Sequence, residues 1–165
     1  MLKNQKFYLV TLTSILLYVS HHVRDPISDF TEEKEIMSVI ERESKSFWDK
    51  DFKNFSDCWA HQDYVRIIGW WSDGGISVTE GWNTIGKKIQ KMMLDNPVPN
   101  PQNPVRKNIN IRIGKDMAWV TFDQYGKDTD DPKFDMPGLS RETRVLEKIE
   151  GKWKIVYVGW LLQGQ

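Results

Sequence analysis

The C-terminal part of the chain holds two apolar stretches, residues 140–149 and 152–162, which are typical of β-strands and are joined by a turn at Glu150-Gly151. A two-residue turn there pairs the strands so that Arg144 lies opposite Tyr157 and shares a face with it. A sheet that is apolar on both sides is covered on both sides, so the hairpin predicts helices on one face and a second copy of the chain on the other. The face expected to meet the second copy carries Val145, Val156, Val158 and Trp160.

Helices precede strands along the chain. An amphipathic helix is expected after a cap at Thr31, a short aromatic helix over residues 52–59, and a third helix over residues 81–94, where the run PVPNPQNP stops it. Further strands are expected at residues 64–71, 105–113 and 117–125. Helices followed by consecutive antiparallel strands predict an α+β fold in which helices cover one face of the sheet.

Composition argues against several classes of function. The 165 residues include 23 basic and 23 acidic side chains, and a chain without a basic excess is not expected to bind nucleic acid. The single cysteine, Cys58, rules out an intramolecular disulfide and multi-cysteine metal sites. The three histidines lack metal-ligand spacing, and the aspartates in residues 128–131 lack the glycine and glutamate of a calcium loop. No metal and no cofactor are therefore expected.

The N-terminal residues differ in character from the rest of the chain. Two lysines precede an uncharged run at residues 7–20, which is the order of a secretory signal and is short for a bilayer crossing. We therefore expect residues 1–20 to be a signal peptide that directs the chain to the periplasm or the medium, residues 21–30 a linker, and residues 31–165 the folded domain. A poor cleavage site leaves two alternatives, an uncleaved membrane anchor and an ordinary buried helix.

The order of these elements and the string SRETRVLEKIEGKWKIVYVG, residues 140–159, resemble the SnoaL-like branch of the nuclear transport factor 2 superfamily. Within that superfamily the chain is most similar to the association domain of calcium/calmodulin-dependent kinase, and the Glu80-Gly81 entry into the third helix also matches. The resemblance implies a cone, in which a curved antiparallel sheet wraps around a long N-terminal helix and a pocket opens between them, usually in a homodimer. The superfamily includes isomerases, dehydratases, epoxide hydrolases, cyclases, transport adaptors and oligomerisation domains, so the resemblance does not decide the function.

Arg144, in the string ETRV, matches an arginine that lines the pocket of the kinase association domain, so the resemblance implies that Arg144 faces the pocket. Thr121 stands where that family places a second pocket arginine, and Tyr157 and Gly159 replace two histidines of its terminal strand. These departures remove positive charge, so the resemblance does not imply the ligand of that family. Ketosteroid isomerases keep a general-base aspartate near the end of the first strand; this chain has only Asp73 there, in a Gly-rich turn, and we do not expect it to act as a base.

Asp123 is the candidate catalytic residue. It lies on a mixed polar and aromatic strand face with Trp119, Thr121 and Tyr125. An aspartate inside an apolar cone and near Arg144 could have its pKa tuned for proton abstraction. The alternative is a structural ion pair or a surface carboxylate, which we favour because the sequence places no second acid–base group beside it.

A second candidate surface lies on the first strand, where Tyr64, Arg66 and Trp70 share one face with Ile68. An arginine among aromatic side chains could hold an anion or stack on a ring, or it could extend into solvent from the sheet edge. Trp70 and Trp71 point to opposite sides of the sheet, so one of them could form the floor of a cavity.

These observations predict an exported, dimeric domain whose pocket binds a small, mainly apolar molecule that carries one polar or anionic group. The expected ligand contacts come first from Arg144 and Tyr157, and then from Arg66, Tyr64, Trp70, Trp119, Thr121 and Tyr125. One alternative is an isomerase, dehydratase or cyclase in which Asp123 removes a proton and Arg144 or a tyrosine stabilises the developing oxyanion. The other is a non-catalytic module that only dimerises or oligomerises through the outer face of the sheet.

Overall fold

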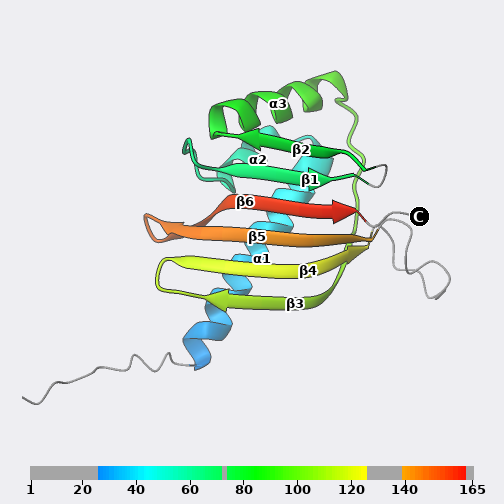
Figure 1. Ribbon diagram of the computed structural model, residues 1–165. Helices are drawn as coiled ribbons and strands as arrows, with labels where there is room; N and C mark the ends of the chain where they lie inside the picture. Colours follow the sequence, from blue (N-terminus) through cyan, green and yellow to red (C-terminus); the bar gives the residue numbers. More distant parts are fainter. Residues whose placement is uncertain (1–25, 72–73, 126–138, 163–165) are drawn as a thin grey trace, which may run out of the picture.

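Within the described residues, which are 26–71, 74–125 and 139–162, the computed structural model has six strands in one sheet and three helices packed against it. In chain order the elements are α1 (Pro26–Asp49), α2 (Phe52–Asp57), β1 (Arg66–Trp70), β2 (Ile76–Glu80), α3 (Trp82–Asp95), β3 (Val105–Ile113), β4 (Met117–Tyr125), β5 (Ser140–Ile149) and β6 (Lys152–Leu162). Figure 1 shows α1 crossing behind the sheet, α2 also behind it near β1 and β2, and α3 along the β2 edge. The expected α+β fold, with helices on one face of a curved sheet, is confirmed.

The N-terminal helix is longer than the sequence indicated. It begins at Pro26 and not at Thr31, and proline is tolerated in a first helical turn because the N–H that it lacks would have no partner there. The expected signal peptide, Asp73 and the aspartates in residues 128–131 lie outside the described residues. Among the helices of the described residues, none is both long enough and apolar enough to span a membrane.

The strand order is β2-β1-β6-β5-β4-β3. Neighbouring strands are antiparallel except β1 and β6, which run parallel, so the expectation of a fully antiparallel sheet is wrong at this one pair. The β1–β2 hairpin joins the sheet through β1, which lies beside β6, the last strand of the chain. The sequence reading did not predict β2, a five-residue edge strand, whereas the bounds of β3 to β6 agree with the predicted strands.

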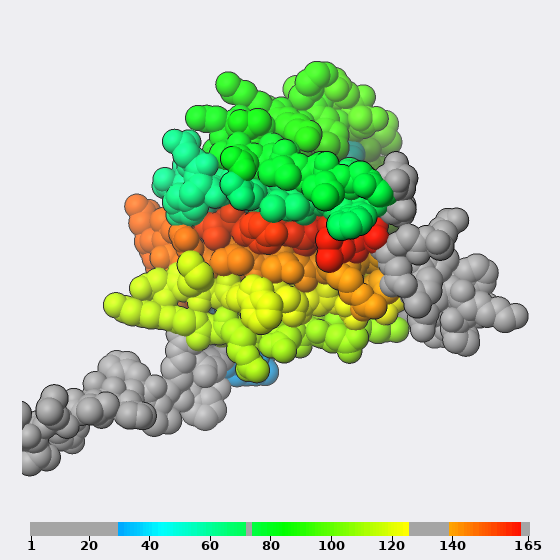
Figure 2. Space-filling view, viewed as in Figure 1, coloured from blue at the N-terminus to red at the C-terminus, as the bar shows by residue number. Residues whose placement is uncertain are grey.

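The hydrophobic core lies between α1 and the inner face of the sheet, the face that the helices cover. From α1 it takes Ile36, Val39 and Ile40, which recur at helical spacing. The sheet contributes fully buried residues from several strands: Val120, Leu146 and Ile155. The opposite or outer face is free of described helices, as Figure 2 shows from that side.

A β-bulge in β6 changes which residues face the core. The predicted pairing holds from the Glu150-Gly151 turn to Leu146 opposite Ile155, but Val156 is an extra residue and Val145 then pairs with Tyr157. Ile155 is fixed on its other side by the segment after α2, since its N–H donates to the Cys58 carbonyl at 2.8 Å. The predicted pairing of Arg144 with Tyr157 is therefore wrong, and Arg144 pairs with Val158.

The same one-residue shift exchanges the two faces of β6 beyond the bulge. Val158 and Trp160 line an inner cavity, and Val156 is buried in the core. They do not form the outer surface expected to meet a second copy. Tyr157 lies on the outer face, where its hydroxyl covers Gly159.

Candidate functional site

A cavity of about 580 Å³ lies between the inner face of β1, β2, β5 and β6 and the helices. Its wall is largely aromatic and aliphatic. Trp71 and Trp160 contact each other edge to face with ring centroids 4.5 Å apart, and Phe55 and Trp59 lie 6.0 Å apart beneath α1. Of the Trp70-Trp71 pair, Trp71 is the residue that reaches the cavity. This volume is within the usual range for sites that enclose a small organic molecule.

Arg144 brings charge to the cavity wall from β5. Its side chain is buried, and its Nη1 donates to Glu142 Oε2 at 2.6 Å and to the Thr143 carbonyl at 3.2 Å. Ser140 Oγ donates to the other oxygen of Glu142 at 2.6 Å. The predicted inward orientation of Arg144 agrees with this placement, and Glu142, two residues away on the same face, holds the guanidinium in position.

Two further charged groups, the buried Glu43 and the half-buried Arg106, complete a charge cluster, which we define as Glu43, Arg106, Glu142 and Arg144. Glu43 projects from α1 and lines the cavity; burial raises the pKa of its carboxyl group, although Arg144 acts in the opposite direction. Arg106 comes from β3, and burial together with the nearby Arg144 lowers its pKa. Both guanidinium groups lie over the Phe122 ring, at 5.4 Å for Arg106 and 5.6 Å for Arg144.

Hydrogen-bond donors around this cluster outnumber the acceptors left for them. Near the cluster, Nε of Arg144 and Nε and Nη2 of Arg106 are buried nitrogen atoms without a hydrogen-bond partner among the described residues. Among the described residues, Gln124 Oε1 is the one buried side-chain acceptor without a hydrogen-bond partner. Because a buried donor without a partner is unfavourable, the site can bind a molecule that brings acceptor oxygens.

The sequence reading missed Glu43 and Arg106. For Glu43 a signal exists, because residues 36, 40, 43 and 47 recur at helical spacing and a carboxylate at the third of these positions stands inside an apolar stripe. Arg106 carries no comparable signal. Its orientation depends on a bulge between Lys107 and Asn110 that shifts the pairing of β3 with β4.

Asp123 lies on the outer face and does not line the cavity. Arg141 donates to Asp123 Oδ1 at 2.5 Å, and Asn108 donates to Oδ2 at 2.7 Å. The hydrogen bond from Arg141, followed by that from Asn108, holds the pKa of Asp123 below its usual value. Its charge partner is therefore Arg141 and not Arg144, and the geometry is that of a structural ion pair.

The other residues expected to contact a ligand also lie outside the cavity. Tyr64 donates its hydroxyl to Glu147 Oε2 at 2.5 Å, and Arg66 pairs with Glu80 at 2.5 Å. The remaining ones alternate with inward residues along their strands and so occupy the outer face: Trp70, Trp119, Thr121, Tyr125 and Tyr157. Of the eight expected ligand contacts, the structure places Arg144 alone at the cavity.

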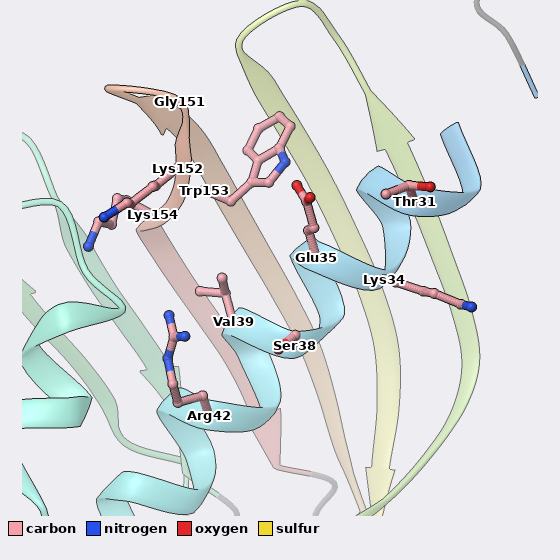
Figure 3. Close-up of a pocket in the computed structure, with 10 residues that line it drawn as sticks. All are labelled: Thr31, Lys34, Glu35, Ser38, Val39, Arg42, Gly151, Lys152, Trp153 and Lys154. Carbon is pink, nitrogen blue, oxygen red and sulfur yellow. The ribbon is translucent and has the colours of Figure 1, made fainter. Parts of the chain in front are cut away.

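A second hollow, of about 500 Å³, lies between the first half of α1 and the start of β6 (Figure 3). It is lined by basic side chains from both elements, among them Lys34, Arg42 and Lys152, and by the acidic Glu35. These four side chains are exposed to solvent, which weakens their attraction for an ion. The cavity beside Arg144 is therefore the better candidate site.

Histidines, cysteines and acidic residues do not gather into a metal site anywhere in the described part of the chain. His61, the one histidine described there, stacks on Trp82 with ring centroids 4.4 Å apart and contacts Ser56. Its ring therefore supports the loop that precedes β1.

Comparison with known proteins agrees with the fold. Residues 36–159 match the SnoaL-like domain family, and no curated protein matches the chain. Among solved structures, an NTF2-like protein of unknown function from Pseudomonas putida KT2440 has a TM-score of 0.59 at 16% identity, covering 80% of this chain and 87% of that one.

Two other solved structures have comparable similarity. A candidate dehydratase of the NTF2-like family from Streptomyces avermitilis has a TM-score of 0.59 at 14% identity, covering 81% of this chain and 97% of that one. A candidate calcium/calmodulin-dependent protein kinase type II association domain from Thiobacillus denitrificans has a TM-score of 0.57 at 12% identity, covering 76% and 93%. These likenesses establish the fold alone. With the family match over residues 36–159, they show that this chain belongs to the SnoaL-like domain family and has the NTF2-like fold.

Proposed function

We propose that this domain binds a small organic molecule with an apolar body and one carboxylate group, and that Arg144 holds the carboxylate. The observation that carries the proposal is a buried guanidinium with an unpartnered Nε beside a cavity whose walls are aromatic. A ligand carboxylate would pair that donor, and the aromatic walls would enclose the apolar body. The cavity volume of about 580 Å³ accommodates a medium-chain or aromatic acid.

The test is calorimetric titration with octanoate, using octanamide as a neutral ligand of the same shape. Arg144→Gln should weaken octanoate binding by about 10- to 100-fold, because a hydrogen bond to a charged group contributes about 1.5–3 kcal/mol. Arg144→Lys, which keeps the charge, should recover part of the loss. Arg66→Gln removes an arginine from the outer face and should leave the affinity unchanged. Equal binding of octanoate and octanamide by the wild type would contradict the proposal.

A proton-transfer enzyme is the second candidate, and Glu43 favours it. This carboxyl lines the cavity with Arg144, and burial raises its pKa, which favours its proton-bound form more than in water. Asp123, on the other face, has no access to the same ligand. An isomerase or dehydratase of this kind would use Glu43 as the base and Arg144 to stabilise the oxyanion. With an enolisable keto acid as substrate, Glu43→Gln should then abolish the exchange of solvent deuterium into the carbon next to the ketone group.

The outer face supports a third part of the proposal, that two copies of the chain associate. Register places Ile76, Trp70 and Leu161 side by side across β2, β1 and β6, and all three are exposed. An exposed apolar row of this kind is stabilised when another protein surface covers it. Val78→Lys, on the same face, should therefore shift the sedimentation coefficient from that of a dimer to that of a monomer, whereas Lys91→Gln on α3 should not.

Export to the periplasm or the medium remains part of the proposal because of the uncharged run at residues 7–20. Expression of the full chain in a bacterium with a general secretion pathway tests it. A mature chain that lacks about twenty N-terminal residues in the periplasmic fraction supports export, and a full-length chain in the cytosol contradicts it.

A further inference from the structure

The charge cluster is balanced before any ligand arrives, and three of its four groups, Glu43, Glu142 and Arg144, are buried. When all four groups are ionised, Glu43 and Glu142 carry two negative charges and Arg106 and Arg144 carry two positive charges. A ligand carboxylate paired with Arg144 would add a third negative charge beside side chains that are themselves buried. Because an unbalanced buried charge is strongly unfavourable, one carboxyl group of the site has to become neutral when the ligand binds.

Glu142 is the wrong group to take up the proton. Its two oxygens accept hydrogen bonds from Ser140 Oγ and from Arg144 Nη1, each at 2.6 Å. Protonation would weaken the contact that positions the Arg144 guanidinium for the ligand. Both oxygens of Glu142 are therefore already used to hold Ser140 and Arg144 in place.

Glu43 is placed to take up the proton. It projects from α1 into the cavity wall, opposite Arg144 on β5, with the like charge of Glu142 beside it and Arg106 of β3 within electrostatic range. A protonated carboxyl group at this position could also donate a hydrogen bond to a ligand carboxylate.

The other titratable groups around Glu43 do not compete for the proton. Cys58, after α2, is a buried thiol whose pKa is raised, so it stays neutral. Lys88 of α3 lines the same cavity, but it is exposed and its Nζ donates to Thr79 Oγ1 at 3.3 Å. Glu43 is therefore the buried carboxyl group of the cavity wall that is left to take up the proton.

We propose that the cavity takes up an organic carboxylate together with one proton from solvent, and that Glu43 holds this proton while the ligand is bound. The inference rests on the proposed carboxylate-binding function. The proton binds to a carboxylate oxygen of Glu43 and returns to solvent when the ligand leaves. Because the bound state holds one more proton than the free state, raising the pH opposes binding wherever Glu43 is ionised in the empty cavity. The site then distinguishes carboxylates, which bind with a proton, from neutral molecules of the same shape, which do not.

The experiment is calorimetric titration of the full domain with octanoate from about pH 5.5 to about pH 9, a range in which this ligand is ionised. Each pH is measured in two buffers that differ in ionisation enthalpy, which gives the number of protons taken up. For the wild type we expect a dissociation constant that is flat at the acidic end and then rises about tenfold per pH unit, with uptake approaching one proton. Glu43→Gln, which stays neutral at every pH, should bind with the low-pH affinity of the wild type throughout and take up none. Glu33→Gln, an exposed glutamate on the same helix, should behave as the wild type does.

The outcomes separate this inference from the function on which it rests. Octanoate binding that is independent of pH in the wild type, or that has the same pH slope in Glu43→Gln, overturns the proton coupling and leaves carboxylate binding intact. No octanoate binding by any variant at any pH overturns the carboxylate-binding function and the coupling with it. Octanamide should bind to both proteins without proton uptake, and uptake with this neutral probe would also contradict the role of Glu43.

Discussion

The inner and outer faces of the sheet carry arginine–carboxylate pairs of nearly equal length in very different surroundings. Arg144 and Glu142 lie 2.6 Å apart on the inner face, with side chains 8% and 5% exposed. Arg66 and Glu80 lie 2.5 Å apart on the outer face, with side chains 46% and 58% exposed. Exposed ions are well solvated whether or not they pair, whereas a buried ion depends on its partner. Burial, and not the distance between the charges, therefore decides how much the loss of one partner of each pair changes the free energy of unfolding.

The largest expected effect comes from breaking the inner pair. Arg144→Met leaves Glu142 buried without its partner and should lower the free energy of unfolding by about 3–5 kcal/mol. Arg66→Met on the outer face should lower it by less than about 1 kcal/mol. Urea denaturation at a fixed protein concentration measures both. The double variant Arg144→Met/Glu142→Met should recover part of the loss because it removes both charges, and equal losses for the two single variants would contradict the comparison.

Two glycines give a matched steric test of the faces. A Cβ at Gly69 would lie 2.1 Å from the Trp160 ring on the inner face, so Gly69→Ala should cost about 1–3 kcal/mol as the indole is displaced. A Cβ at Gly159 would lie 2.8 Å from the Tyr157 hydroxyl, the free end of an outer side chain that can move aside. Gly159→Ala should therefore cost less than about 1 kcal/mol. Thermal unfolding followed by tryptophan fluorescence checks both values. A larger stability loss for Gly159→Ala than for Gly69→Ala would contradict the assignment of Trp160 to the inner face and Tyr157 to the outer face.

The two faces should also respond to pH in opposite directions. The pKa of Glu43 is raised in the folded chain, so its contribution to stability is present below the unfolded value of about 4.3 and is lost as the pH rises through the folded pKa. Glu43→Gln removes this loss, so its stability relative to the wild type should increase as the pH rises.

The pKa of Asp123 is lowered, so its contribution is present above the unfolded value of about 3.9 and is lost as the pH falls through the folded pKa. Asp123→Asn should be less stable than the wild type by about 1 kcal/mol at neutral pH, and the difference should close in acid. Urea denaturation at several pH values tests both variants. A stability difference for Asp123→Asn that persists in acid would show that the loss is not electrostatic.

How far the sequence predicts this molecule depends on whether a pattern is local. Alternation located β3 to β6, and the Glu150-Gly151 turn fixed the register of the hairpin as far as Leu146. The register beyond that point depends on the extra residue Val156, and the preceding Ile155 is held by backbone hydrogen bonds to Cys58 and Ala60, in a segment far away in the sequence. A contact between distant segments leaves no local pattern, so the sequence placed Tyr157, Val158 and Trp160 of β6 on the wrong faces, whereas Arg144 of β5 was oriented correctly.

The lack of a local signal also explains why the sequence predicted most ligand contacts on the wrong face of the sheet. Alternation groups Tyr64, Arg66 and Trp70 correctly on one side of the sheet, although β1 begins only at Arg66. It does not say which face meets the helices when both faces are apolar. Glu43 could have been found, because a carboxylate within an apolar helical stripe is unusual. Its proximity to Arg144 could not, because it arises from the way α1 crosses the sheet (Figure 1).

The smallest expected effect tests the outer placement directly. Tyr64 was expected to contact a ligand, but it is exposed and its hydroxyl donates to Glu147 at 2.5 Å on the outer face. Tyr64→Phe should therefore change the free energy of unfolding by less than about 1 kcal/mol, because an exposed hydrogen bond is readily replaced by water. Its octanoate affinity, measured by calorimetry, should equal that of the wild type. If Tyr64→Phe weakened octanoate binding as much as Arg144→Gln does, the ligand site would have to include the outer face, and the contrast between the two faces would fail.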